Sequence, residues 1–139
     1  MRLRRSLATA ETLLALALAW VLVFAVAFRR TVAWLGRAGV PGTAVVTVAP
    51  DKILRARHVC LRVARFAPRV PWRTSCLVQA VAGCLLLRRR GIAATIRLGV
   101  KKDGGVLSAH AWLMVGGQVV LGGQAAEGFK ALADIGGVT

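Results

Sequence analysis

The central element of the fold is predicted by residues 71–91, PWRTSCLVQAVAGCLLLRRRG. Thr74 or Ser75 is suited to the N-cap of a helix, because a hydroxyl oxygen accepts hydrogen bonds from the unpaired N–H groups of the first turn. Gly91 is suited to ending the same helix, since glycine readily adopts the left-handed conformation that follows the last turn. Apolar side chains cover most of the circumference between these ends. We therefore predict a central, largely buried helix that carries Cys76 in its first turn.

Short apolar runs separated by glycines follow this helix. Such a change from helical spacing is typical of strands joined by turns. The stretch KKDGG predicts a first turn, and Gly116-Gly117 predicts a tight hairpin turn. A short helix over Ala125 to Asp134 is expected to close the fold. Helices followed by an antiparallel meander make the predicted fold class α+β. The three predicted strands span residues 92–100, 106–115 and 118–121.

A second helix is predicted upstream, over Asp51 to Phe66. Asp51 follows a proline and is suited to the N-cap, while Pro68 and Pro71 end the helix because proline cannot continue it. One face of this helix is basic, which fits either a solvated surface or a docking surface for an acidic partner. The cations on that face are Lys52, Arg55, Arg62 and Arg65.

An uncharged run, Thr12 to Phe28, has arginines on both sides. Three interpretations stay open: a helix packed on the protein or lying on a surface, a membrane span, and a signal peptide. At about 1.5 Å per residue the run is about 25 Å long, just short of a hydrocarbon core of about 30 Å. Glycines after the run predict a loop near residues 36–42. We divide the chain into a hydrophobic helical region, residues 1–48, and a second domain, residues 49–139, with any membrane association through residues 13–28.

The composition of this chain of 139 residues favours an anionic partner. Lys and Arg outnumber Asp and Glu by 20 to 5, which gives a net charge of +15. All four tryptophans lie in apolar surroundings rather than in a basic patch, so no nucleic-acid partner is expected. The spacings of Cys60, Cys76 and Cys84 match no zinc pattern, and neither a metal nor another cofactor is expected. Free thiols suit a reducing compartment, so we expect the protein in the cytoplasm.

Cys76 and His110 are the candidate catalytic residues. The first turn of a helix favours a thiolate, because unpaired N–H groups and the positive end of the dipole stabilise negative charge. His110 lies in the strand-like stretch SAHAWLMVGG, residues 108–117, where alternation puts it on one face with Trp112. A strand packed on the helix would bring the thiol and the ring together as a nucleophile and its base. The other two cysteines are predicted to be packing residues.

A family resemblance is carried by the stretches PWRTSCLVQAVAGCLLLRRRGIAATIRLGV and AHAWLMVGGQVVLGG. Residues 71–123 resemble the transglutaminase-like cysteine peptidase domain of lasso-peptide biosynthesis, the McjB C-terminal type. The shared features are a Pro-Trp ahead of the cysteine, an arginine-rich helix end followed by Gly-Ile, a Leu-Gly-Val strand end and an Ala-His-Ala-Trp strand. The resemblance implies a transglutaminase/papain-like core, in which a helix bearing the cysteine packs on a small antiparallel sheet bearing the histidine. It also implies that the domain of residues 49–139 is a transglutaminase-like cysteine peptidase domain, preceded by a hydrophobic N-terminal helix.

The same resemblance implies an activity, the removal of the leader from a ribosomally synthesised lasso-peptide precursor. Cys76 matches the nucleophile that forms a thioester, and His110 matches the base that protonates the leaving amine and then activates water. The family has an aspartate shortly after the histidine, where this chain has glycines. We predict Gln124 as the third catalytic residue, slightly ahead of Gln118; a main-chain carbonyl and Glu127 are the alternatives.

The resemblance also implies partners. They are the leader region of the precursor peptide, a small leader-recognition protein and an asparagine-synthetase-like cyclase. The missing aspartate keeps a second interpretation open, in which the protein is a catalytically impaired relative that scaffolds a peptide-maturation complex at the membrane. Another acyl transfer, such as amide crosslinking, is a third.

Overall fold

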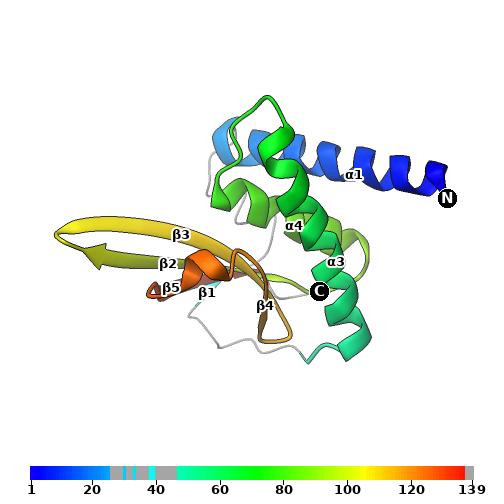
Figure 1. Ribbon diagram of the computed structural model, residues 1–139. Coiled ribbons are helices and arrows are strands. Elements are labelled where there is room, and N and C mark those ends of the chain that lie inside the picture. The colour runs from blue at the N-terminus through cyan, green and yellow to red at the C-terminus, as the bar shows by residue number, and fades with distance from the viewer. Residues whose placement is uncertain (26–29, 31–32, 34–37, 40–46, 137–139) are drawn as a thin grey trace.

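A computed structural model describes residues 1–25, 30, 33, 38–39 and 47–136 of the chain. The described part combines helices with a five-stranded antiparallel sheet in the order β1-β5-β2-β3-β4, which confirms the predicted α+β class (Figure 1). The helices are α1 (Arg2–Trp20), α3 (Pro50–Phe66) and α4 (Cys76–Arg89), and the strands are β1 (Ala38–Gly39), β2 (Thr95–Asp103), β3 (Val106–Val115), β4 (Gln118–Leu121) and β5 (Lys130–Gly136).

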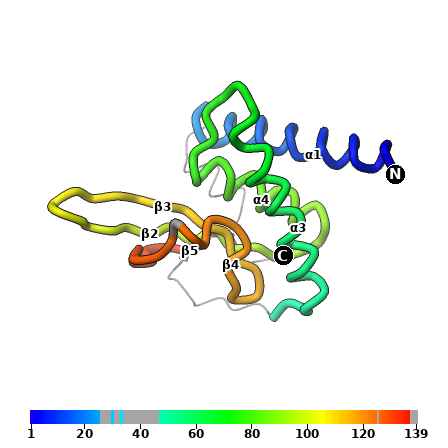
Figure 2. The backbone as a smooth tube through the Cα atoms, viewed as in Figure 1, coloured from blue at the N-terminus to red at the C-terminus, as the bar shows by residue number. Residues whose placement is uncertain are grey.

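Helix α4 is the centre of the packing, as its apolar circumference predicts. It contacts α1 and α3 and also strands β2 and β3 (Figure 2). Ser75 is its N-cap, and the N–H of Val78 donates to the Ser75 hydroxyl oxygen at 3.3 Å. Gly91, with a φ of 68°, follows its last turn and confirms the predicted end. These two ends fix Cys76 as the first residue of a buried helix.

The predicted hairpins are present. Strands β3 and β4 span the predicted residues, because glycine pairs with positive φ, Gly104-Gly105 and Gly116-Gly117, form the turns between strands. Strand β2 begins at Thr95 rather than at Ile92 and pairs with β3 along its whole length. In this register Gly99 lies opposite His110. The sheet therefore holds His110 in the middle of a long, well-paired strand.

The helix predicted over Ala125 to Asp134 is wrong. This segment forms a short 3-10 helix, Gln124–Ala126, and then strand β5. Strand β5 lies between β1 and β2, so its backbone pairs on both sides. The guanidinium group of Arg97 on β2 also donates to both carboxylate oxygens of Asp134, at 2.8 and 3.0 Å. These partners are distant in sequence, and such pairing overrides the local preference of a short segment.

Helix α3 confirms the second predicted helix but corrects its N-cap. Ala49 is the N-cap, Pro50 is the first helical residue, and Asp51 lies in the first turn. Proline suits that first position because its missing N–H would have had no partner there. The Asp51 carboxylate instead complements the positive end of the helix dipole. The residues that α3 buries in the core are Ala56, Val59, Cys60 and Val63.

Helix α1 packs on α4 and α3 through one narrow face. A π-helical turn, Val21–Ala25, continues it. By length and composition, Arg2–Ala25 is the one helix among the described residues that could cross a membrane, and core helices and signal sequences meet the same criterion. The end of the predicted apolar run, residues 26–28, and most of the loop predicted near residues 36–42 lie outside the described residues. The buried face of α1 consists of Thr12, Ala15, Leu16 and Ala19.

Candidate active site

Cys76 begins α4, and its side chain is half-buried against the hydrophobic core. The N–H groups of Val78 and Gln79 are paired with the hydroxyl and carbonyl oxygens of Ser75, at 3.3 and 3.0 Å. The N–H groups of Cys76 and Leu77 have no hydrogen-bond partner within the described part of the chain. Free N–H groups and the helix dipole stabilise negative charge that develops at this end of the helix.

The two other cysteines lie deep in the core. Burial raises the pKa of the Cys60 thiol to about 12 and that of the Cys84 thiol to about 11. Both side chains therefore stay protonated near neutral pH and fill space as small apolar groups. Cys76 is the cysteine best placed for nucleophilic chemistry, because it is half-buried at a helix start.

The ring of His110 is held by contacts on the face of β3 that it shares with Trp112. The two ring centroids are 5.8 Å apart in a stacked arrangement, and the Phe129 ring lies 5.4 Å from the histidine ring. The Nε2 atom of His110 is 3.1 Å from the carbonyl oxygen of Gly122. A carbonyl oxygen only accepts hydrogen bonds, so Nε2 is the donor in this contact. In the tautomer that makes this hydrogen bond, the lone pair is on Nδ1.

Cys76 and His110 lie on elements that pack against each other, α4 and β3. In the described part of the chain, no hydrogen bond joins the Cys76 sulfur to the His110 ring. Catalytic hydrogen bonds are often long or poorly aligned before substrate binds. The structure therefore puts the two residues on neighbouring elements. Leu113 is on the face of β3 next to Gly83 of α4, and alternation along the strand puts His110 on the other face. The pairing of Cys76 and His110 as nucleophile and base stays a prediction.

The candidates for the third catalytic residue lie on the segment after β3. Gln124 is exposed at the start of the 3-10 helix, and Glu127 is exposed just after it. The side-chain oxygen of Gln118 accepts a hydrogen bond from Arg57 at 2.7 Å. The group that contacts His110 is the carbonyl of Gly122, the main-chain alternative. The role predicted for Gln124 stays a prediction.

The chain matches the transglutaminase-like superfamily over residues 22–134, which is most of its length. It belongs to that superfamily. Comparisons with curated proteins and with solved structures found no match. Membership confirms the predicted transglutaminase-like core, and this superfamily generally includes cysteine proteases and transferases. The matched span contains both Cys76 and His110.

Trp72 is a residue of this superfamily domain to which the sequence assigns no chemical role. Its indole Nε1 is buried and has no hydrogen-bond partner among the described residues. A buried donor without a partner lowers the free energy of unfolding by about 1–3 kcal/mol, so the presence of this indole N–H needs an explanation. Trp72 precedes the nucleophile candidate by four positions. The Pro-Trp pair ahead of the cysteine is the sequence feature that could identify Trp72 as a candidate site residue.

Metal-binding side chains are also dispersed. Among residues 1–25, 30, 33, 38–39 and 47–136, no group of three or more His, Cys, Asp or Glu side chains is placed to hold a metal ion.

Proposed function

We propose that this protein is a cysteine peptidase that removes the leader from a ribosomally synthesised lasso-peptide precursor. The observation that carries the proposal is the anchored His110 ring. Its Nε2 lies 3.1 Å from the Gly122 carbonyl oxygen, and Nδ1 is the atom of the neutral ring that can accept a proton. Superfamily membership and a cysteine at the start of α4 support the same chemistry. The Pro-Trp, Gly-Ile and Ala-His-Ala-Trp motifs of the lasso-peptide family support the substrate class.

The reaction uses these groups in two steps. Nδ1 of His110 takes the proton of the Cys76 thiol, and the sulfur attacks the scissile carbonyl carbon. The C–N bond breaks as the imidazolium returns the proton to the leaving amine, which leaves a thioester on Cys76. His110 then takes a proton from water, and hydroxide attacks the thioester and releases the acid and the thiol. The Gly122 carbonyl keeps the ring in one tautomer and stabilises the imidazolium through its dipole.

Negative charge on the carbonyl oxygen needs hydrogen-bond donors in the transition state. The N–H groups of Cys76 and Leu77 are two donors at the start of α4 that have no partner among the described residues. The indole N–H of Trp72 is a third donor without a partner in the described chain. We assign the oxyanion to the N–H of Cys76, with Trp72 as the second donor once substrate binding rearranges the loop between them.

The open edge of β3 supports a polypeptide substrate. Strand β4 pairs only with residues 113–115 of β3. Residues 106–109 are exposed, and no described residue pairs with their outer edge. Figure 1 shows this hairpin extending beyond the helices. Unpaired strand edges bind extended peptides through main-chain hydrogen bonds. A precursor bound there runs along β3 toward His110.

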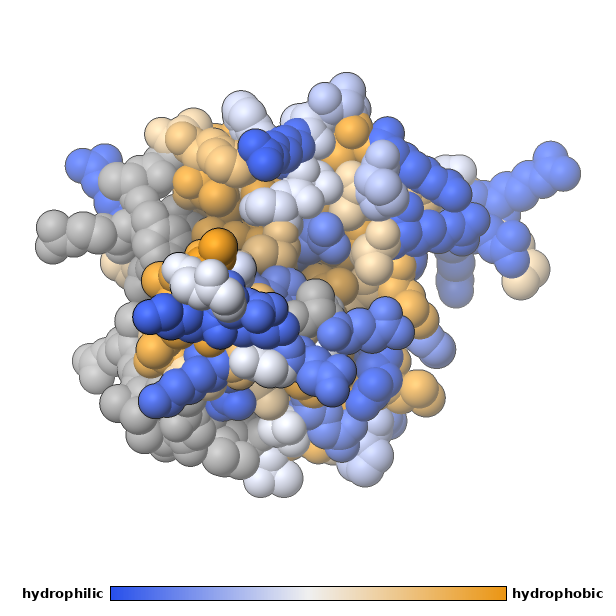
Figure 3. Space-filling view, turned by 60° about the vertical axis from the view of Figure 1, so that its left-hand side comes forward, coloured by the Kyte–Doolittle hydropathy of each residue, from blue (hydrophilic) through white to orange (hydrophobic). Residues whose placement is uncertain are grey.

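Positive charge near the nucleophile supports an acidic leader. The Arg65 and Arg69 guanidinium groups lie 5.9 and 5.8 Å from the centre of the Phe66 ring, at the end of α3. The Thr74 hydroxyl donates to the Ala67 carbonyl at 2.8 Å and ties this basic end to the residues just before α4. In Figure 3 hydrophilic side chains cover much of the visible face, with hydrophobic ones exposed between them. A chain with a net charge of +15 attracts acidic peptides.

The proposal includes partners and a location. A small leader-recognition protein presents the precursor, and an asparagine-synthetase-like cyclase consumes the released core peptide. We place the enzyme in the cytoplasm, because its cysteines are free thiols. The length and apolar character of α1 support an association with the membrane.

A cleavage assay tests the peptidase. The full chain is mixed with a candidate leader-recognition protein and a candidate lasso-peptide precursor, and products are identified by mass spectrometry. We expect cleavage by the natural protein and a loss of about a thousandfold or more in Cys76→Ala and His110→Ala. Cys84→Ala is the matched control, because it removes a buried thiol from the same helix. Cleavage that survives in Cys76→Ala would refute the assignment.

The scaffold alternative has its own observation: among the described residues, the His110 ring is hydrogen-bonded to a neutral carbonyl and to no carboxylate. It predicts that the natural protein binds the precursor complex without cleaving it. Product formation by the purified chain excludes this alternative, and binding without any product supports it.

A further inference from the structure

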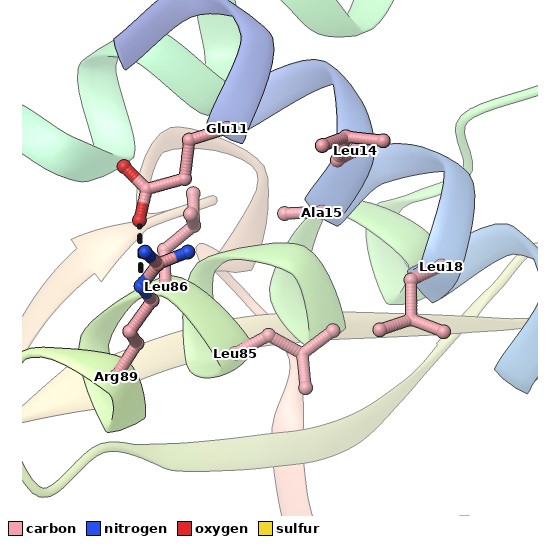
Figure 4. Close-up of a pocket in the computed structure, with 7 residues that line it drawn as sticks. All are labelled: Glu11, Leu14, Ala15, Leu18, Leu85, Leu86 and Arg89. Atoms are coloured by element: carbon pink, nitrogen blue, oxygen red, sulfur yellow. Dashed lines mark ion pairs between the residues drawn. The ribbon is translucent and has the colours of Figure 1, made fainter. Parts of the chain in front are cut away.

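An apolar groove of about 260 Å³ lies between α1 and α4 (Figure 4). Leu14 and Leu18 from α1 and Leu85 from α4 line its length. Glu11 and Arg89 lie at one end, where they form an ion pair. We call this feature the α1–α4 groove. Its shape and polarity suit a ligand with an apolar chain and one charged end.

The charged end of the groove is positive. The Glu11 carboxylate is already bound by two hydrogen bonds from Arg90, at 3.0 and 2.7 Å. The Arg89 Nε lies farther from that carboxylate, at 3.6 Å, and its side chain is 75% exposed. Arg90 neutralises Glu11, the acidic residue of the groove. The Arg89 guanidinium therefore keeps N–H groups that can donate hydrogen bonds to a phosphate.

Exposed leucines extend the apolar surface along α1. Leu3, Leu7, Leu14 and Leu18 are 73%, 61%, 70% and 48% exposed. Separations of four and seven residues put them on one side of the helix, and we call them the leucine stripe. Leu14 and Leu18 belong to the stripe and also line the groove, so the two features form one continuous surface.

The charges flanking the leucine stripe favour an anionic lipid surface as its occupant. Arg2, Arg4 and Arg5 are exposed at the start of α1, and Arg89 lies beside the groove. Within α1 the sole acidic residue is Glu11, which is ion-paired. An apolar stripe bordered by arginines is the pattern of helices that lie in the membrane interface. An acidic peptide would match the arginines but would leave the leucines exposed.

The contacts of α1 also argue against a span. Thr12, Leu16 and Ala19 are fully buried against the rest of the protein, and Glu11 holds Arg90. Moving α1 into a bilayer core would break these contacts and separate the ion pair. Lying in the interface preserves them, because the leucine stripe is on a different side of the helix.

We propose that the α1–α4 groove binds an anionic phospholipid of the membrane, with its phosphate at Arg89 and an acyl chain along Leu14, Leu18 and Leu85. Helix α1 then lies in the plane of the membrane surface. This inference rests on the membrane association proposed above and does not require peptidase activity.

Vesicle sedimentation tests the inference. The full chain is mixed with phosphatidylcholine vesicles or with vesicles of phosphatidylcholine and phosphatidylglycerol at roughly 3:1, and bound protein is measured. We expect binding to the anionic vesicles and at least tenfold weaker binding by the Leu14→Gln/Leu18→Gln variant. The matched control is Leu54→Gln/Leu61→Gln, which changes two exposed leucines of α3 and should bind like the natural protein.

A charge variant tests the groove itself. Arg89→Gln should weaken binding about fivefold, whereas Arg55→Gln on exposed α3 should have little effect. Equal binding by Leu14→Gln/Leu18→Gln and the natural protein would overturn the inference. So would equal effects of Arg89→Gln and Arg55→Gln, which indicate attraction by net charge alone. Resistance of the bound protein to alkaline carbonate would also overturn it, because that result indicates a span.

The peptidase and the lipid site can fail separately. Cleavage is assayed without vesicles, and vesicle binding is measured on Cys76→Ala, which lacks the nucleophile. Vesicle binding by that variant supports the lipid site even if no cleavage is ever seen. Cleavage by a protein that does not bind anionic vesicles overturns the lipid site and leaves the peptidase standing.

Discussion

The Nε2 atom of His110 lies 3.1 Å from the carbonyl oxygen of Gly122. The family resemblance predicts a carboxylate side chain for this role, whereas the observed partner of the ring is a main-chain group. A carbonyl fixes the tautomer of the ring as a carboxylate does, but it lacks the full negative charge that stabilises an imidazolium. If His110 is the base, this contact orients it without an acidic third residue. Its consequences for activity can be measured.

The first prediction concerns the backbone of Gly122, which has a φ of 80°. A Cβ atom there would lie 3.2 Å from the Trp112 Cβ and 3.3 Å from the Ala111 carbonyl oxygen. We expect Gly122→Ala to displace the carbonyl and to lower kcat roughly tenfold or more. The control is Gly117→Ala, because Gly117 has a φ of 79° and open space around it.

Both glycine variants should lose about 1–2 kcal/mol of unfolding free energy, since an L-residue is strained at positive φ. Only Gly122→Ala should lose activity when both are assayed well below their unfolding temperatures. Full kcat in a folded Gly122→Ala variant would contradict the proposed role of the carbonyl.

The second prediction separates Gln124 from Gly122. Gln124 is exposed, and the His110 ring contacts the Gly122 carbonyl. If the carbonyl orients the ring, Gln124→Ala keeps kcat within about twofold of the natural protein. If Gln124 is the third catalytic residue, the same variant loses most of its activity. Steady-state cleavage rates over a range of pH values distinguish the two results.

The third prediction concerns the indole N–H of Trp72. Trp72→Phe removes a buried donor that has no partner in the described chain and keeps an aromatic ring. We expect unchanged or slightly higher stability, because no hydrogen bond is lost. As an oxyanion donor, the indole should also matter for kcat, and its removal should lower kcat about tenfold to a hundredfold with little change in KM. Unchanged kcat would leave Trp72 with a packing role.

The fourth prediction is that Cys76 reacts first with an alkylating reagent. With pKa values of about 12 and 11, Cys60 and Cys84 are ionised at about pH 8 to roughly one part in ten thousand and one in a thousand. Burial also shields both sulfurs from the reagent. Mass spectrometry of the folded protein should find one label, on Cys76, and none in Cys76→Ser. Labelling of Cys84 at an equal rate would contradict its buried position.

The local part of the fold follows from the sequence. The ends of helices and strands depend on residues close by in the sequence, here Ser75, Gly91 and the glycine pairs. The bounds of α4, β3 and β4 therefore agree with prediction. Strand β5 cannot be predicted from its own sequence, because its conformation depends on pairing with β1 and β2. The short stretch KALADIG fits a helix or a strand until its neighbours are known.

The candidate site also has a part that the sequence predicts and a part that it does not. Cys76 and His110 are identifiable because their residue types and flanking motifs are unusual. The Gly122 carbonyl cannot be identified from the sequence, because every residue has a main-chain carbonyl. The fold determines which carbonyl contacts the His110 ring. The ion pair of Glu11 with Arg90 joins residues that are 79 positions apart, and no local pattern predicts it. That ion pair has a measurable effect on stability.

The last prediction is that Glu11 stabilises the fold in a pH-dependent way. The hydrogen bond from Arg90, aided by the charges of Arg90 and Arg89, holds the pKa of Glu11 below its ordinary value of 4.5 despite partial burial. The unfolded chain therefore binds a proton more readily than the folded one. Stability from Glu11 is fully present above about pH 4.5 and is lost as the pH falls through the lower pKa of the folded state.

Glu11→Gln should accordingly lower the unfolding free energy by about 1–3 kcal/mol near neutral pH, since it weakens hydrogen bonds to a charged group. The deficit should shrink toward zero at about pH 3 or below, where the natural carboxylate is itself protonated. Urea unfolding at both pH values measures the difference. Glu127→Gln is the control, because Glu127 is exposed, and it should change stability little at either pH. A deficit in Glu11→Gln of equal size at both pH values would mean that side-chain packing, and not the charge of Glu11, joins α1 to α4.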